Sequence, residues 1–172
     1  MKLENLNDLF ILELQDLYDA EQQITQAIPQ LLTVVQSPQL KEIMETHLRQ
    51  TESQIERLEK ICREMDIEPV GKQCVGMEGI IEGSIELLQD NLTPSATLDA
   101  ALISCAQKIQ HYKISGYGSA AAYAKQLRFT TAQATLAEIM NEEKQTDTEL
   151  SSLAEGVINK QADPATGTKY AM

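Results

Sequence analysis

The chain has 172 residues, which suits a single domain, and its formal net charge of −12 at pH 7 disfavours nucleic acid or an anionic membrane as a direct partner. Only 8 glycines and 5 prolines occur, and strong helix formers dominate, so the composition favours an all-α fold. No apolar run approaches the roughly 18 residues of a membrane-spanning helix, and residues 1–5 lack a secretory-signal pattern. These features predict a cytoplasmic protein with no nucleic-acid or membrane partner.

Apolar residues recur with helical spacing in five segments of the chain. The long segments cover about residues 3–36, 38–67, 94–127 and 131–159, and a shorter one covers about residues 77–90. Ser37-Pro38 and Thr93-Pro94 supply start signals for two of the long helices. Thr130 begins a capping-box pattern, which predicts the start of the last long helix.

The spacing of these segments also predicts how they connect. Segments 3–36 and 38–67 have almost no loop between them, so they must form an antiparallel hairpin, and segments 94–127 and 131–159 form a second one. A longer connection containing the short helix joins the two hairpins, which is the layout of a ferritin-like four-helix bundle. We therefore predict a bundle domain over residues 1–159 and a flexible polar tail over residues 160–172.

Polar residues interrupt the apolar stripes of all four long segments near mid-length. Glu21 interrupts the first stripe, and Glu143 and Asp147 interrupt the last. Folding the first hairpin about its turn brings Gln54 to the level of Glu21. The same operation on the second hairpin brings the acids to the level of Gln110, His111, Tyr112 and Lys113. Because an ionised carboxylate in an apolar core is costly unless paired, we expect these residues to hold a cation.

The identity of that cation is the functional question. Paired carboxylate-bearing helices are typical of non-haem di-iron and di-manganese proteins, which commonly place glutamate and histidine in E-x-x-H spacing. This chain contains no E-x-x-H, and its two histidines are His47 and His111. A lone histidine on an apolar stripe is more often a hydrogen-bonded core residue than a ligand. A complete di-metal ligand set therefore cannot be assembled from these residues.

Three segments carry a resemblance to a known family. They are residues 13–21 (ELQDLYDAE), 107–118 (QKIQHYKISGYG) and 141–147 (NEEKQTD). In sequence order and spacing they resemble the YciE/YciF family of ferritin-like bacterial stress proteins, over nearly the whole chain. The resemblance implies a rubrerythrin-related bundle, a homodimer, and a fold whose relatives bind two metals.

The resemblance can be carried over position by position. Glu21, Glu143 and Asp147 fall where the family keeps acids. Gln54 stands where members often carry histidine, and Gln110 and Lys113 stand where glutamates surround a His-Tyr pair. Lys113 instead suggests an internal positive charge among the three acids. We therefore predict a metal-free ion network, with a residual iron or manganese site as the alternative; its candidate ligands are Glu21, Glu143, Asp147 and His111.

Three functions remain open on this basis. The first is a dimeric, stress-associated protein with a degenerate metal centre and no robust oxidase chemistry. The second is a metalloprotein whose iron or manganese reacts with oxygen or peroxide. The third is a structural or partner-binding bundle in which the polar residues only fix the helix register. Among the cysteines, Cys62 and Cys105 are interpreted as core thiols, and Cys74, in a predicted loop, is the candidate for a reactive one.

Overall fold

The computed structural model describes residues 2–89 and 93–163, apart from the side chain of Leu88. Within these residues the secondary structure is entirely helical. The helices are α1 (Leu6–Leu32), α2 (Pro38–Glu64), α3 (Val75–Gln89), α4 (Ala96–Gln126) and α5 (Thr130–Leu153), followed by a π-helical turn (Ala154–Ile158) and α6 (Asn159–Ala162). The last long helix thus continues three residues into the segment predicted as a tail, and residues 164–172 lie outside the described residues.

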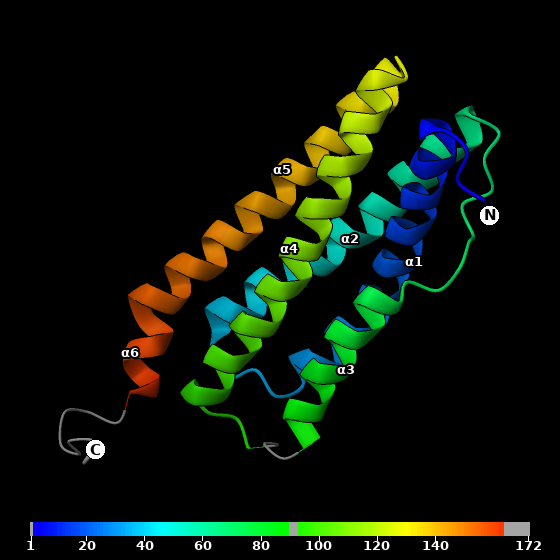
Figure 1. The fold of residues 1–172 in the computed structure, drawn as a ribbon. Coiled ribbons are helices and arrows are strands. Elements are labelled where there is room, and N and C mark those ends of the chain that lie inside the picture. The colour runs from blue at the N-terminus through cyan, green and yellow to red at the C-terminus, as the bar shows by residue number, and fades with distance from the viewer. Residues whose placement is uncertain (1, 90–92, 164–172) are drawn as a thin grey trace, which may run out of the picture.

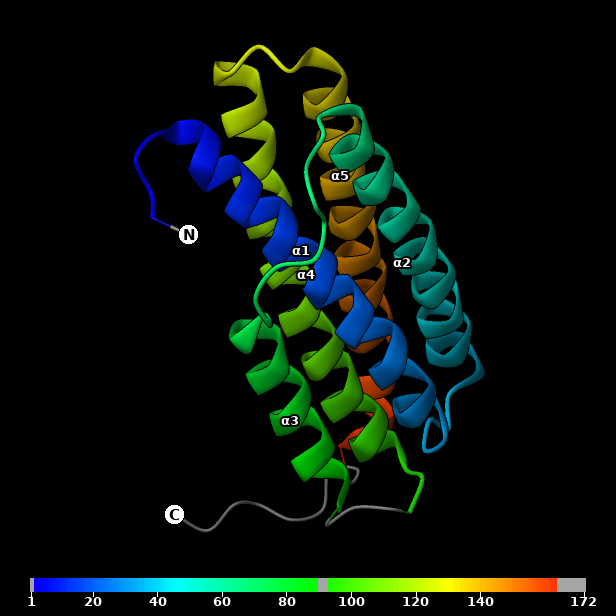
Figure 2. The same ribbon diagram turned by 90° about the vertical axis from the view of Figure 1, so that its right-hand side faces the viewer.

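The helices form two antiparallel hairpins, α1 with α2 and α4 with α5 (Figure 1). The hairpins pack with α1 beside α4 and α2 beside α5, which gives a bundle of four long helices. Helix α3 lies outside this bundle against α1 and α4, after a connection that runs back along α1 (Figure 2). The predicted all-α fold of two hairpins with a short crossover helix is confirmed.

The helix starts follow from local capping chemistry, with two differences from the prediction. Ser37 caps α2 by accepting the N–H of Leu40, as its position before a proline predicts. Helix α4 begins at Ala96 with Ser95 as its N-cap, so the N-cap predicted at Thr93 lies two residues too early. The capping box at Thr130 is wrong, because Thr130 is already helical and no described side chain caps this turn.

Helix α1 ends at Leu32, earlier than predicted, because the turn that follows it is held by Asp99 at the start of α4. The carboxylate of Asp99 accepts the backbone N–H of Gln36 at 2.9 Å and that of Ser37 at 2.8 Å. Asp99 is 1% exposed, and its bond to Ser37 is buried, whereas its bond to Gln36 is partly buried. The second hairpin thereby fixes the turn of the first.

We expect Asp99→Ala to lower the free energy of unfolding by roughly 1–3 kcal/mol, because it leaves the buried N–H of Ser37 and the partly buried N–H of Gln36 without their acceptor. Asp99→Asn should cause a smaller loss, since one carbonyl oxygen remains. Urea unfolding followed by circular dichroism measures both values. A loss below about 0.5 kcal/mol for the alanine variant, the usual range of surface substitutions, would contradict this role.

Of three apolar clusters among the described residues, two lie toward the ends of the bundle, and the third lies where α3 packs against α1 and α4. The first includes Phe10 and Leu14 of α1 and Leu136 of α5, and the second includes Leu40 of α2 and Leu102 of α4. In each long helix the two clusters are separated along the chain by buried polar residues near mid-length. The apolar clusters therefore enclose a polar layer and exclude water from it.

Candidate functional site

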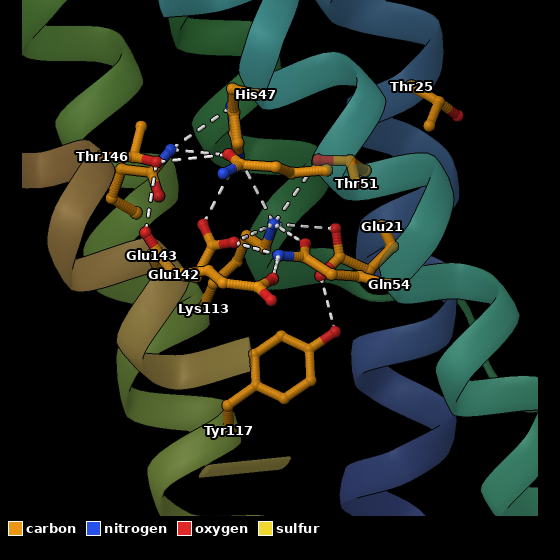
Figure 3. A network of polar contacts seen from close by, with 12 residues as sticks. Glu21, Thr25, His47, Thr51, Gln54, Lys113, Tyr117, Glu142, Glu143 and Thr146 are labelled. Atoms are coloured by element: carbon orange, nitrogen blue, oxygen red, sulfur yellow. Dashed lines mark hydrogen bonds and ion pairs between the residues drawn. The ribbon is translucent and has the colours of Figure 1, made fainter. Parts of the chain in front are cut away.

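Each of the four long helices contributes buried polar side chains to one layer of the bundle (Figure 3). The central layer consists of Glu21 from α1, His47, Thr51 and Gln54 from α2, Gln110, Lys113 and Tyr117 from α4, and Glu143 from α5. Each of these residues is at most 4% exposed. Groups that would normally be hydrated must therefore satisfy one another here.

The ammonium group of Lys113 lies at the middle of the central layer. Its Nζ is 3.0 Å from Glu21 Oε2 and 3.0 Å from Glu143 Oε1, and it donates to Gln54 Oε1 at 2.7 Å. One lysine thus joins carboxylates that come from different hairpins. The structure brings these four predicted residues together, with Lys113 between the two acids.

A second set of hydrogen bonds fixes the two carboxylates. Tyr117 donates its hydroxyl to Glu21 Oε1 at 2.6 Å, and Gln54 donates its amide to Glu143 Oε1 at 2.6 Å. The same amide lies 3.0 Å from Glu142, whose carboxylate pairs with both terminal nitrogens of Arg57. The network therefore extends from the fully buried acids to a partly exposed ion pair at the edge of the bundle.

His47 closes the central layer on the α2 side. Its Nε2 is 3.4 Å from Glu143 Oε2 and 3.4 Å from Lys113 Nζ, and Gln110 Nε2 lies 3.0 Å from the same ring nitrogen. Burial lowers the pKa of His47, and the Lys113 charge lowers it further. His47 is thus a neutral hydrogen-bonded core residue, as its isolated position on the stripe predicts.

The charges of the central layer are unequal, because two carboxylates face one ammonium group. Burial raises the pKa of Glu21 to about 7, although the Lys113 charge acts to lower it. Burial also acts to raise the pKa of Glu143, but Lys113 and His47 outweigh it and bring that pKa down to about 2. Burial opposes the charge on Lys113, yet the two acids keep its pKa above the ordinary value. Lys113 therefore pairs with both acids, of which Glu143 has the lowered pKa and Glu21 the raised one.

Asp147 and His111 do not join the central layer. The His111 side chain is 67% exposed and the Asp147 side chain 21%, and the two lie 3.5 Å apart where α4 meets α5. His111 is two positions from Lys113, and helix positions two apart do not face the same way. Asp147 lies one turn beyond Glu143 and accepts a hydrogen bond from Gln107 instead. Asp147 and His111 therefore lie apart from the central layer that contains Glu21 and Glu143.

Two further expectations change at the start of α3. Cys74 is 0% exposed rather than free in a loop, and its Sγ lies 2.9 Å from the Tyr112 hydroxyl. Tyr112 in turn donates to Asp16 at 2.6 Å, which directs it away from the central layer. Burial raises the pKa of the Cys74 thiol, so the reactive thiolate is disfavoured. Cys74 thus anchors α3 to α1 and α4 and is not a reactive thiol.

Tyr117 and the Arg57–Glu142 pair are parts of the network that the sequence does not single out. From the sequence alone, Tyr117 is interpreted as an amphipathic residue at the edge of the core, but it is fully buried. The available signal is its position four residues after Lys113, which places both on one face of α4. Arg57 is likewise three residues after Gln54, but its place in a run of exposed charges hides the relation.

The donor set does not fit a di-metal centre. A protonated lysine offers N–H donors and no lone pair, and Lys113 Nζ occupies the space between the two carboxylates where a metal would need to lie. Within residues 2–89 and 93–163, no three His, Cys, Asp or Glu side chains converge closely enough to hold a metal ion. The positive charge that faces these two acids is the ammonium group of Lys113.

The fold and the central layer define a class, an all-α bundle protein with a buried ion network across four helices. Residues 5–163 match the family described as a domain of unknown function, DUF892. The chain is also 37% identical to the protein YciF of Escherichia coli strain K12 over 164 residues, which cover 95% of this chain and 98% of YciF. The chain therefore belongs to the DUF892 family, and the resemblance to YciF drawn from its sequence is confirmed.

Solved structures of relatives have the same fold. The crystal structure of the E. coli stress protein YciF matches with a TM-score of 0.86 at 37% identity, covering 92% of this chain and 99% of that chain. YcfI from Rhodopseudomonas palustris matches with a TM-score of 0.84 at 32% identity, covering 88% of this chain and 96% of that chain. None of the described helices has the length and apolar character needed to cross a membrane.

Proposed function

We propose that this chain is a stress-associated, ferritin-like protein in which an internal ion network stands in place of a di-metal centre. The observation that carries the proposal is the position of Lys113 Nζ, 3.0 Å from a carboxylate oxygen of Glu21 and 3.0 Å from one of Glu143. The stress association is supported by the relative YciF, which is described as a stress protein. The homodimer is the state that the family resemblance implies, and a cytoplasmic location is part of the same proposal.

In this proposal the central layer stabilises and orients the bundle and does not carry out oxygen or peroxide chemistry. Its contacts join α1 and α2 to α4 and α5, so they select one relative register of the two hairpins. Buried polar groups can specify a unique packing in this way, because any shift leaves charges unpaired. In this proposal the protein acts by binding partners at its surface.

The metal content of the wild-type protein tests this proposal. We expect far less than one iron or manganese ion per chain after expression in medium supplemented with both metals, because the Lys113 ammonium already lies between the two carboxylates. Elemental analysis of freshly purified protein measures the content, and Glu143→Ala provides the matched control for adventitious metal. Near-stoichiometric metal that disappears in Glu143→Ala would overturn the proposal and support a metalloprotein.

A further inference from the structure

Helix α3 lies on the outside of the bundle, alongside α1 (Figure 2). The two helices border a groove of about 250 Å³, which continues along α3 into a hollow of about 310 Å³, because Glu82 and Ile85 line both. This α3 groove is lined by glutamines within residues 23–30 of α1 and, on α3, by Glu78, Ile81, Glu82, Ile85 and Glu86. Ile85 is only partly buried and belongs to none of the apolar clusters of the described residues, so the bundle leaves this apolar surface uncovered.

The outward face of α3 has the spacing of a helix-pairing surface. Val75, Glu78, Glu82, Ile85 and Gln89 follow one another in alternating steps of three and four residues, which places them in one stripe along the helix. All five are exposed or only partly buried, and Val75 is 72% exposed. At 1.5 Å per residue the stripe is roughly 21 Å long, which is about four turns of an α-helix. A groove of this length between two helices suits a third helix laid along it.

The α3 groove carries negative charge that the described part of the chain does not balance. Helix α3 contains Glu78, Glu82 and Glu86 and no lysine or arginine, and none of the described residues that line the groove is basic. Glu78 accepts a hydrogen bond from Gln73 at 2.7 Å, whereas Glu82 and Glu86 form no ion pair within residues 2–89 and 93–163. An occupant that matches this surface therefore brings lysine or arginine to the acids and apolar side chains to the remaining positions.

We infer that the α3 groove is the docking surface for a basic amphipathic helix of another protein. The inference rests on the proposed function and deepens it, because it names the surface that binds a partner and the chemistry of that partner. A second copy of this chain is a poor match, since two facing α3 helices would oppose like charges and each chain carries a net charge of −12. The apolar positions of the stripe supply contact area, and the glutamates select a positively charged helix.

Binding of a synthetic peptide to the full-length protein tests the inference. The probe is a fluorescently labelled helical peptide with the length of α3, 15 residues, which carries leucine and alanine on one face and lysine on the other. Fluorescence anisotropy at about 0.15 M salt, where distant charges are screened, measures its Kd. We expect saturable one-to-one binding to the wild-type protein. The double variant Glu82→Gln/Glu86→Gln should raise the Kd roughly fivefold through lost ion pairs. Ile85→Ser should raise it roughly tenfold through lost apolar contact.

Glu52→Gln/Glu56→Gln is the matched control, because it removes the same charge at the same spacing from exposed positions of α2. It should change the Kd by less than about twofold, since these positions lie outside the α3 groove. Equal weakening by the two double variants would overturn the inference, because the peptide would then respond only to the net charge of the protein. Circular dichroism checks that each variant is folded.

Two further outcomes would also overturn the inference. The first is the absence of saturable peptide binding by the wild-type protein. The second is a dimer, detected by light scattering, that Ile85→Ser converts to a monomer, because a second copy of this chain would then occupy the groove. Failure here is distinct from failure of the proposed ion network, which depends on the metal content of the wild-type protein.

Discussion

Lys113→Met is expected to lower the free energy of unfolding by about 3–5 kcal/mol at pH 7, because it removes the charged partner of two buried carboxylates. Methionine has a similar length and fills much of the same space, so the loss reports on charge and hydrogen bonding more than on a cavity. Chemical denaturation followed by circular dichroism measures it. Lys108→Met on the exposed side of α4 is the control and should change stability by less than about 0.5 kcal/mol.

The effect of Lys113→Met should depend on pH in a defined direction. As pH falls and Glu21 and Glu143 take up protons, the acids no longer need a cation, so the difference from wild type should shrink. An unchanged stability and an unchanged pH profile in Lys113→Met would show that the ion network is not what holds the bundle together. The central layer would then be interpreted as a set of polar residues that only fix helix register.

The wild-type protein is expected to lose stability as pH rises from about 4.5 toward 7, and Glu21 is the reason. Its pKa is raised to about 7 in the folded state from an ordinary value of 4.5, so the native state holds a proton that the unfolded chain releases. That contribution is complete below pH 4.5 and is lost as pH rises through 7, by up to about 3 kcal/mol. The charged or titratable groups that act on Glu21 are Lys113, Glu143 and Tyr117.

Glu143 acts in the opposite direction at lower pH. Its folded-state pKa is lowered to about 2, so its contribution is present above pH 4.5 and is lost as pH falls toward 2. Together the two acids place the stability maximum from this layer near pH 4.5, their shared ordinary value, because the Glu143 contribution is gained below it and the Glu21 contribution is lost above it. The maximum thus lies on the acidic side of neutrality.

Glu21→Gln tests the assignment, because glutamine resembles the protonated acid and cannot ionise. We expect this variant to flatten the stability profile between pH 5 and 8 and to equal or exceed wild type at pH 8. Unfolding curves across that range measure the effect, and Glu42→Gln, an exposed substitution, should keep the wild-type slope. A Glu21→Gln profile as steep as that of wild type would show that another group takes up the proton.

The helical architecture could be predicted from the sequence because its causes are local. Apolar spacing places the four long helices, and the short turn at Ser37 requires an antiparallel hairpin. The same reasoning aligns Glu21 with Gln54, and Lys113 with Glu143, since residues equally distant from a hairpin turn lie at equal depth. The contacts of these four residues therefore follow largely from periodicity and chain connectivity.

The remaining parts of the site depend on contacts that periodicity does not encode. His111 faces outward and Asp147 lies at the α4–α5 contact beside Gln107, and a rotation of this size around a helix is not resolved by apolar spacing. The role of Asp99 depends on bonds to Gln36 and Ser37, more than sixty positions away in the chain. Cys74 is buried because α3 docks on α1 and α4, which the sequence of the connecting loop does not reveal.

The bonds from Asp99 to the first hairpin, together with the central layer, have a consequence for folding cooperativity. The α1–α2 hairpin lacks an acceptor for its own turn and carries Glu21 without a cation, and both deficits are met from α4. The first hairpin is therefore not self-sufficient, so partly unfolded forms in which it alone stays intact should be sparsely populated. Helices α1 and α2 should thus not remain folded after α4 and α5 have unfolded.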